Sequence, residues 1–325
     1  MCIKNSTVYL APLEGLADAP MRRVLCAHGG YDLCYSEFIR VTDLKVVKKT
    51  FIREVPELLN DGKTLDGTPI RVQLLGDNLK TLAASARTAY DLGAKSIDLN
   101  FGCPSRFVHH SGAMLLKEPE LLTSIVLAVR DALPDDCLLS CKVRLGFLDD
   151  SESFDIIKAV AQEGVKEICV HARTRKGLYR QEALNWEAIR PLHEYKGSAV
   201  LIANGNINSL AEALLCEKVT LCHNFMCGRG GFATPNLGHC IKEGAPPYSY
   251  AKLLQTCREV LLTFKDTPRS DKIVMDRTKQ FLGYAKMNRN DVQDFFRRFC
   301  QSSDPEDGLR LLDAEITRSH NNESL

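Results

Sequence analysis

A cysteine in a short turn is the residue of this sequence best placed to do chemistry. Cys103 lies in segment 98–105, DLNFGCPS, directly after an apolar run that predicts a buried strand. Gly102 frees the backbone and Pro104 fixes φ, so the turn can hold a side chain at the mouth of a strand. Most cysteines in a chain that has thirteen pack in the core. Cys103 is therefore a candidate because of its position.

The elements that position this turn predict a barrel. Most of the apolar runs are continuous, which is typical of strands covered on both faces. The predicted strands are Val8–Ala11, Leu33–Glu37, Ile70–Leu75, Ser96–Asn100, Leu138–Val143, Glu167–His171, Ala199–Ala203 and Leu221–Cys227. Helical segments between them start near Asp77, Ser151 or Ser153, and Asn208. No G-x-G-x-x-G motif follows the first strand, so the pattern favours a parallel (β/α)8 TIM barrel over a Rossmann sheet.

The pattern changes after residues 244–247, GAPP. From Tyr248 to Leu325 the apolar residues recur at helical spacing, without strand signals. The sequence therefore predicts a TIM-barrel domain over residues 1–243, followed by a small helical domain of three or four helices over residues 244–325.

Composition narrows the class of protein. The net charge of +1 gives no global attraction for nucleic acid, so any such surface must be local. The cysteines show no zinc-site spacing, and Cys34, Cys141, Cys169 and Cys227 are expected in the core. Nowhere do eighteen apolar residues run together. We therefore expect a cytoplasmic protein that binds no metal and does not associate with membranes. We also expect it to be a monomer.

Two predicted loops favour a phosphate site. The seventh predicted strand leads into Asn204, Gly205 and Asn206, and the eighth leads into Gly228 and Arg229. In TIM barrels these two loops commonly bind phosphate through glycine-rich backbone amides.

The predicted barrel lumen holds further polar residues. A cation such as Lys142, with His171 nearby, can stabilise negative charge on a reduced flavin. The Gln73 amide can bond a ring edge. A lone Lys or His in an apolar strand is more often a structural residue, so neither indicates a function by itself.

Several motifs, in order, resemble those of the tRNA-dihydrouridine synthase family over most of the chain. They are APLEG at 11–15, NFGCP at 100–104, KVRLG at 142–146, HART at 171–174, NGNI at 204–207 and GRG at 228–230. The family usually has Met where this chain has Leu13, and segment 106–114 differs from its usual Lys-containing, Gly-rich loop. Segments 13–37, 74–76 and 115–119 are most similar to the bacterial C-type branch, which modifies position 16.

The resemblance implies an FMN-binding TIM barrel, a C-terminal tRNA-binding domain and a reaction. NADPH would reduce FMN, hydride would pass from flavin N5 to C6 of a D-loop uridine, and Cys103 would protonate C5. The implied cofactor-binding residues are Pro12, Leu13, Glu14, Gln73, Lys142, His171, Asn204, Gly205, Asn206, Gly228 and Arg229. The implied residues facing the base are Glu37, Asn100 and Arg144.

Thiol chemistry favours the role of general acid for Cys103. An ordinary thiol, with a pKa near 8.5, is mostly protonated at neutral pH and can donate without tuning. A nucleophilic cysteine needs a lowered pKa instead. The sequence assigns no base to it, although His109 and His110 are near along the chain.

A local basic segment favours RNA binding. Between Lys265 and Arg298 nine lysine and arginine residues oppose five aspartates, a net of +4. Such side chains can contact phosphates, although a solvated helical face is the competing interpretation. The expected contacts include Arg277, Lys279, Lys286, Arg289, Arg297 and Arg298.

Two other functions remain open from the residues. The first is an FMN-dependent oxidoreductase acting on a small pyrimidine or related molecule, which would not need the basic helical tail. The second is a non-catalytic RNA-binding barrel, which would not take up flavin.

Overall fold

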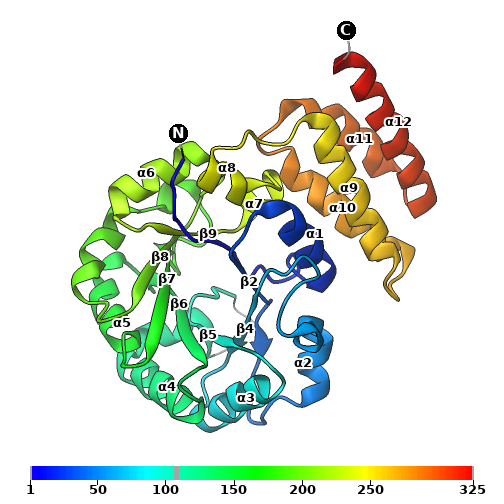
Figure 1. Ribbon diagram of the computed structural model, residues 1–325. Helices are drawn as coiled ribbons and strands as arrows, with labels where there is room; N and C mark the ends of the chain where they lie inside the picture. Colours follow the sequence, from blue (N-terminus) through cyan, green and yellow to red (C-terminus); the bar gives the residue numbers. More distant parts are fainter. Residues whose placement is uncertain (1, 106–109, 324–325) are drawn as a thin grey trace.

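A closed parallel barrel forms the larger part of the molecule (Figure 1). The computed structural model describes residues 2–105 and 110–323. Its strands are β1 (Val8–Leu10), β2 (Leu33–Tyr35), β3 (Ile39–Arg40), β4 (Ile70–Leu75), β5 (Ser96–Asn100), β6 (Leu138–Gly146), β7 (Val165–Thr174), β8 (Val200–Asn204) and β9 (Asn224–Cys227). They run in the order β2-β1-β9-β8-β7-β6-β5-β4-β3, and β2 also pairs with β4. That pairing closes the ring and leaves β3 as a short addition to β4, which confirms the TIM barrel.

The strand bounds follow the apolar runs, with informative differences. β4 and β5 have the predicted bounds, while β6 and β7 continue past the apolar run to Gly146 and Thr174. The added residues include the polar Arg144, Arg173 and Thr174 and lie where the barrel opens, which is why the run of apolar residues ends earlier. β9 begins later than predicted because the helix before it continues to Thr220, with Leu221 closing that helix at φ 60°. The four cysteines expected in the core are buried.

Helices surround the barrel on its outer face (Figure 1). They are α1 (Ala19–Gly29), α2 (Lys48–Glu54), α3 (Leu79–Asp91), α4 (Pro119–Ala132), α5 (Ser153–Val160), α6 (Leu210–Thr220), α7 (Arg229–Ala233) and α8 (Leu237–Glu243). Asn78 caps α3 and Ser209 caps α6, each one residue after the expected cap. Between β7 and β8 the chain forms a 3-10 helix, Glu187–Glu194, that contains Pro191, which lacks the N–H an α-helix needs.

A polar layer lies inside the barrel. Arg71 donates to the Tyr35 hydroxyl at 2.7 Å and to Glu167 Oε2 at 2.5 Å, and Tyr9 donates to Glu167 Oε1 at 2.8 Å. Buried charge is tolerated only when it is paired and hydrogen-bonded, as here. This layer comes from the early residues of the strands, so the lumen beneath the open end is packed.

Four α-helices of the described residues follow Gly244 (Figure 1). They are α9 (Tyr250–Lys265), α10 (Asp271–Ala285), α11 (Gln293–Gln301) and α12 (Pro305–Glu323). Helix α9 packs against α1 and α10 against α7, while α11 and α12 pack on α9 and α10. The apolar face of α9, which includes Leu253, Cys257 and Val260, is buried. No helix among the described residues combines the length and the hydropathy that crossing a bilayer requires.

Candidate active site

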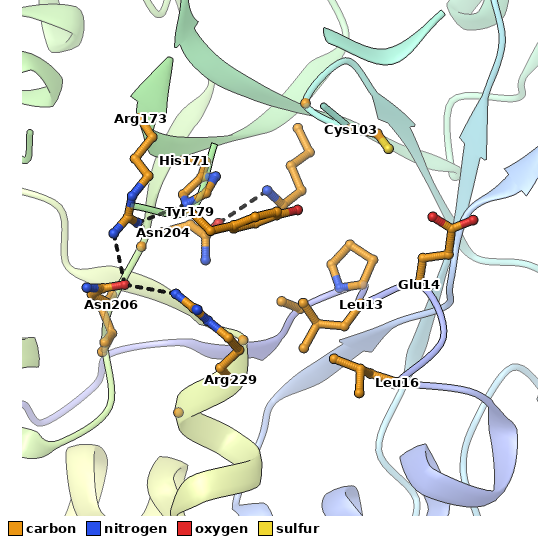
Figure 2. Close-up of a pocket in the computed structure, with 18 of the residues that line it drawn as sticks. Leu13, Glu14, Leu16, Cys103, His171, Arg173, Tyr179, Asn204, Asn206 and Arg229 are labelled. Carbon is orange, nitrogen blue, oxygen red and sulfur yellow. Dashed lines mark hydrogen bonds between the residues drawn. The ribbon is translucent and has the colours of Figure 1, made fainter. Parts of the chain in front are cut away.

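A cavity of about 390 Å³ opens at the carboxyl ends of the strands (Figure 2). Parallel strands all end at this rim, so residues far apart in the sequence meet there. The expected residues that line it are Pro12, Leu13, Glu14, Asn100, Cys103, Lys142, Arg144, His171, Asn204, Gly205, Asn206, Gly228 and Arg229. The sequence did not predict several others, among them Leu16, Phe38, Arg173, Tyr179 and Tyr284.

Positive charge is concentrated at one side of the cavity. Arg173 and Arg229 both donate to Asn206 Oδ1, at 3.2 and 3.4 Å, and Arg173 Nη1 lies 3.3 Å from His171 Nε2 (Figure 2). Burial and the charge of Arg229 lower the pKa of Arg173 to about 10. Burial also lowers the pKa of His171 well below its usual range, so that ring is neutral. A bound anion would relieve this repulsion, so the cluster is suited to a phosphate.

Lys142 adds a cation to the floor of the cavity. Its ammonium donates to Asn204 Oδ1 at 3.2 Å, and Asn204 Nδ2 donates to the Met226 carbonyl at 2.8 Å. Because the carbonyl accepts only, it fixes which end of the Asn204 amide faces Lys142. Burial lowers the pKa of Lys142. The lysine is thus held in place by a neutral partner, which leaves its charge available to a ligand.

Two glycines let the loops after β8 and β9 approach closely. Gly205 has φ +125°, and a Cβ there would lie 3.2 Å from the His171 ring. A Cβ on Gly230 would lie 2.3 Å from the Ile207 carbonyl oxygen, inside van der Waals contact. A side chain at Gly230 would therefore push apart the two loops expected to bind phosphate, and one at Gly205 would press on His171 and strain the backbone.

The turn that holds Cys103 is fixed by Asn100. Asn100 Oδ1 accepts from the backbone N–H groups of Gly102 and Cys103, both at 2.9 Å. The Cys103 carbonyl accepts from Ala113 N at 2.9 Å. Burial raises the pKa of the Cys103 thiol, and the nearby Glu14 carboxylate adds to this. The thiol is therefore protonated at neutral pH, the state that a general acid requires.

The two histidines that are near Cys103 along the chain do not supply a described base for its thiol. His109 belongs to residues 106–109, which lie outside the described residues, and His110 is exposed. Cys103 lies on the side of the cavity away from Arg173 and Arg229, next to Glu14 (Figure 2). Among the described residues no three His, Cys, Asp or Glu side chains gather as metal ligands.

Gln73 and Glu37 do not line the cavity, contrary to expectation. Gln73 is fully buried, and its amide donates to Asp98 and accepts from Asn100. It lies one layer below the cavity, a depth that strand alternation alone does not reveal. Glu37 Oε1 accepts from Leu16 N at 3.0 Å and so supports the β1–α1 loop.

Arg144 reaches the cavity but is also a structural residue. Its guanidinium donates to the carbonyls of Gly102 at 2.7 Å and Leu178 at 2.9 Å, and it lies over the Tyr179 ring at 5.2 Å. It therefore joins the Cys103 turn to the loop after β7. The Tyr179 ring is half exposed at the cavity edge, where Arg229 also contacts it.

Arg277 has a role different from the expected phosphate contact. It is buried and donates to Asp18 Oδ1 at 2.7 Å, to the Leu16 carbonyl at 2.6 Å and to the Gly15 carbonyl. Arg269 donates to the other Asp18 oxygen at 2.6 Å. Asp18 precedes α1 but makes no capping bond to it, because its carboxylate is used here. Arg277 thus attaches α10 to the β1–α1 loop that lines the cavity.

The remaining basic residues are only partly available to RNA. Arg298 donates to Glu315 at 2.7 Å, Arg297 pairs with Asp294 and Arg289 pairs with Asp291. Lys279 lies on α10, and Lys286 is the residue that caps its C-terminal end. Lys279 is partly exposed.

Replacing Arg277 with methionine is expected to loosen the β1–α1 loop. Loss of charged hydrogen bonds from a buried group should lower the free energy of unfolding by about 2 kcal/mol. Urea unfolding measures this change. The matched control is Arg297→Met, since Arg297 is exposed and pairs only with exposed Asp294, so a shift below about 0.5 kcal/mol is expected. Equal shifts in the two variants would contradict an attachment role for Arg277.

The fold and the cavity together define a class of protein. It is a TIM-barrel enzyme with a cluster of positively charged side chains on one side of its strand-end cavity and a protonated thiol on the other. The family model for dihydrouridine synthase matches residues 9–321. The chain belongs to this family, whose members are flavin enzymes, and the resemblance found in the motifs is confirmed.

Curated relatives cover nearly the whole chain. A protein of Haemophilus ducreyi named tRNA-dihydrouridine(16) synthase is 42% identical over 292 residues, 89% of each chain. A protein of the same name from Haemophilus influenzae is 41% identical over 304 residues, 91% of this chain and 96% of the relative. A third, from Neisseria meningitidis serogroup A, is 37% identical over 318 residues, 96% of this chain and 95% of the relative.

Proposed function

We propose that this protein uses FMN and NADPH to reduce the C5–C6 bond of a uridine in the D-loop of tRNA, at position 16. The observation that carries the proposal is the pairing, in one cavity, of a phosphate-type cation cluster with the protonated Cys103 thiol. Family membership supports the reaction, and the names of the relatives support the position. The proposed tRNA substrate supports a cytoplasmic location.

The cavity lining fits FMN chemically. Arg173 and Arg229, with the backbone of Gly205 and Gly228, would hold the phosphate, because they supply charge and amide donors at the two glycine-containing loops. The partly buried Leu13 would offer an apolar surface to the ring system. A volume of about 390 Å³ lies within the usual range for ligand pockets.

This chain's residues would perform orientation and proton transfer. When bound and reduced by NADPH, FMN would supply the hydride that C6 of the uracil receives. Lys142 would favour negative charge on the ring system. Asn100 and Arg144 fix the turn, and the Cys103 thiol releases its proton to C5. Burial of the thiol keeps it protonated until the base arrives.

The tRNA must present one base to this cavity. A uridine in a folded RNA has to leave its stack to reach a reactive group in a cavity. Lys279 on α10 and Lys286 at its C-terminal cap are the basic residues that we propose as phosphate contacts, since α10 also supplies Tyr284 to the cavity lining. Reversing the charge of Lys279 should weaken tRNA binding and reduce its salt dependence.

The proposal is tested with purified protein, FMN, NADPH and unmodified tRNA. We expect dihydrouridine at position 16 and no reduction of free uridine, measured by mass spectrometry of tRNA fragments. Turnover of free uridine or a small pyrimidine with no product in tRNA would favour the small-molecule oxidoreductase. A protein that binds tRNA but takes up no flavin would favour the non-catalytic barrel. Mapping dihydrouridine in cells with and without the gene gives an independent check.

A further inference from the structure

A row of polar side chains crosses three strands below the catalytic turn. Gln73 on β4 lies opposite Asp98 on β5, and Asp98 lies opposite Ser140 on β6. Side chains in register across parallel strands point to the same face, so all three point into the barrel. Gln73 and Asp98 are fully buried and Ser140 is 1% exposed. Asn100 follows Asp98 by two residues and therefore lies on the same face, one layer nearer the cavity.

The hydrogen bonds of this row have a fixed direction. Asp98 accepts from Ser140 Oγ at 2.5 Å and from Gln73 Nε2 at 2.7 Å. An ionised carboxylate only accepts, so Gln73 must turn its NH₂ toward Asp98 and its oxygen away. That oxygen accepts from Asn100 Nδ2 at 2.8 Å. Asn100 must then direct its own oxygen toward the backbone N–H groups of the turn.

We infer that Asp98 is the positioning residue of the Cys103 turn, acting through Gln73 and Asn100. The ionised carboxylate sets the orientation of two amides in sequence, and the second accepts from Gly102 N and Cys103 N. The chemical significance of this positioning rests on the proposed function, in which Cys103 donates a proton. The positioning itself is a property of the turn, and it is measurable without tRNA.

Burying the ionised carboxylate of Asp98 has an energetic cost, which its hydrogen bonds must offset. Taking an ionised group out of water costs several kcal/mol unless its oxygens are satisfied. Asp98 has donors on both oxygens, and neither bond is to a cation. An apolar residue at this position would leave the buried Ser140 hydroxyl and Gln73 amide without an acceptor, so the row depends on the carboxylate.

Protonation of Asp98 would remove the directional constraint. Burial raises the pKa of Asp98 to about 6, above its usual range. The titratable or charged groups that face it from neighbouring strands are Arg71, Lys142, Tyr35, Cys141 and Cys169. The tyrosine and the two cysteines have raised pKa values and stay neutral near pH 6. The constraint is thus present above pH 6 and is lost as the pH falls through that value, because a protonated carboxyl can also donate.

Hydrogen exchange of the Gly102 and Cys103 amides tests the inference on the full chain with FMN added. In the wild type we expect protection of these two amides to fall at least tenfold between pH 7 and pH 5, after correction for intrinsic exchange. Asp98→Ala should lose at least tenfold in protection already at pH 8. Ser140→Ala is the matched control, since it leaves the bond between Asp98 and Gln73 in place and should keep protection at pH 8.

Ser140→Ala also distinguishes positioning of the Cys103 turn by ionised Asp98 from a general loss of packing. The hydroxyl of Ser140 lowers the pKa of Asp98, so Ser140→Ala should move the acid loss of protection to higher pH. The inference is overturned by wild-type protection that is constant from pH 7 to pH 5, a measurement that needs no variant. Failure to form dihydrouridine would instead count against the proposed function and leave the exchange result intact.

Discussion

Cys103→Ala is expected to stop dihydrouridine formation while the protein still binds FMN and oxidises NADPH. The turn is held by Asn100 and by the carbonyl of Cys103, and the sulfur adds one hydrogen bond from the Ser105 backbone N–H, so the turn keeps its other bonds when the thiol is removed. Removing a general acid costs about 10²–10⁴-fold in rate. Single-turnover reduction of tRNA by pre-reduced enzyme measures this loss directly. The anaerobic rate of flavin reduction by NADPH should change less than about threefold, because the cation cluster proposed to hold FMN lies away from the thiol and stays in place without it.

The control for this variant is Cys300→Ala. Cys300 is an exposed thiol on α11, so its removal should leave both half-reactions unchanged. Wild-type turnover by Cys103→Ala would assign the proton to another donor. Equal loss in both half-reactions would show that the variant damages the flavin site.

Arg229→Met is expected to weaken the binding of FMN much more than the binding of riboflavin. Charge-assisted hydrogen bonds to phosphate contribute about 1.5–3 kcal/mol each, which corresponds to roughly 10- to 150-fold in affinity. Riboflavin lacks the phosphate, so its affinity should change less than about threefold. Quenching of flavin fluorescence gives both dissociation constants. The affinity of the wild type for FMN should also fall with salt, and that of the variant should fall less.

The control for the phosphate side is Arg180→Met. Arg180 contacts Arg173 through its backbone carbonyl, while its own guanidinium is exposed and lies 3.7 Å from Glu182. Its replacement removes a nearby charge without removing a residue of the cavity lining. Equal loss of FMN affinity in the two variants would contradict a direct contact between Arg229 and the phosphate. It would show that any nearby positive charge has the same effect.

The sequence predicted the layout of the site better than its details. Strand ends in a parallel barrel meet at one rim, so Cys103, Lys142, His171 and the two glycine-containing loops came together as expected. Arg173 was missed, although its place two residues after His171 on one strand puts both on the same face. Gln73 shows the limit of such reasoning, because alternation gives the face of a residue and not its depth.

Long side chains and distant contacts explain most of the other differences. A run of basic residues in α10 indicates a charged helix, but nothing in the run marks Arg277 as buried against Asp18, 259 residues earlier. Tyr179 follows Leu178, which has φ +50°, and no local pattern predicts that the chain turns its ring toward the cavity. These features depend on how the barrel and the helices pack, which spacing along one segment does not record.

The attachment of α10 to the barrel limits how the barrel and the helical tail of this chain could be exchanged for other parts. Arg277 holds the loop of Gly15 and Leu16, and Tyr284 from the same helix forms part of the cavity wall. A barrel grafted onto a foreign helical tail would lose both. The tail is therefore not an interchangeable module, and a change in α10 that alters a contact with RNA would also alter the wall of the cavity. Selection on these two properties would act on the same few side chains.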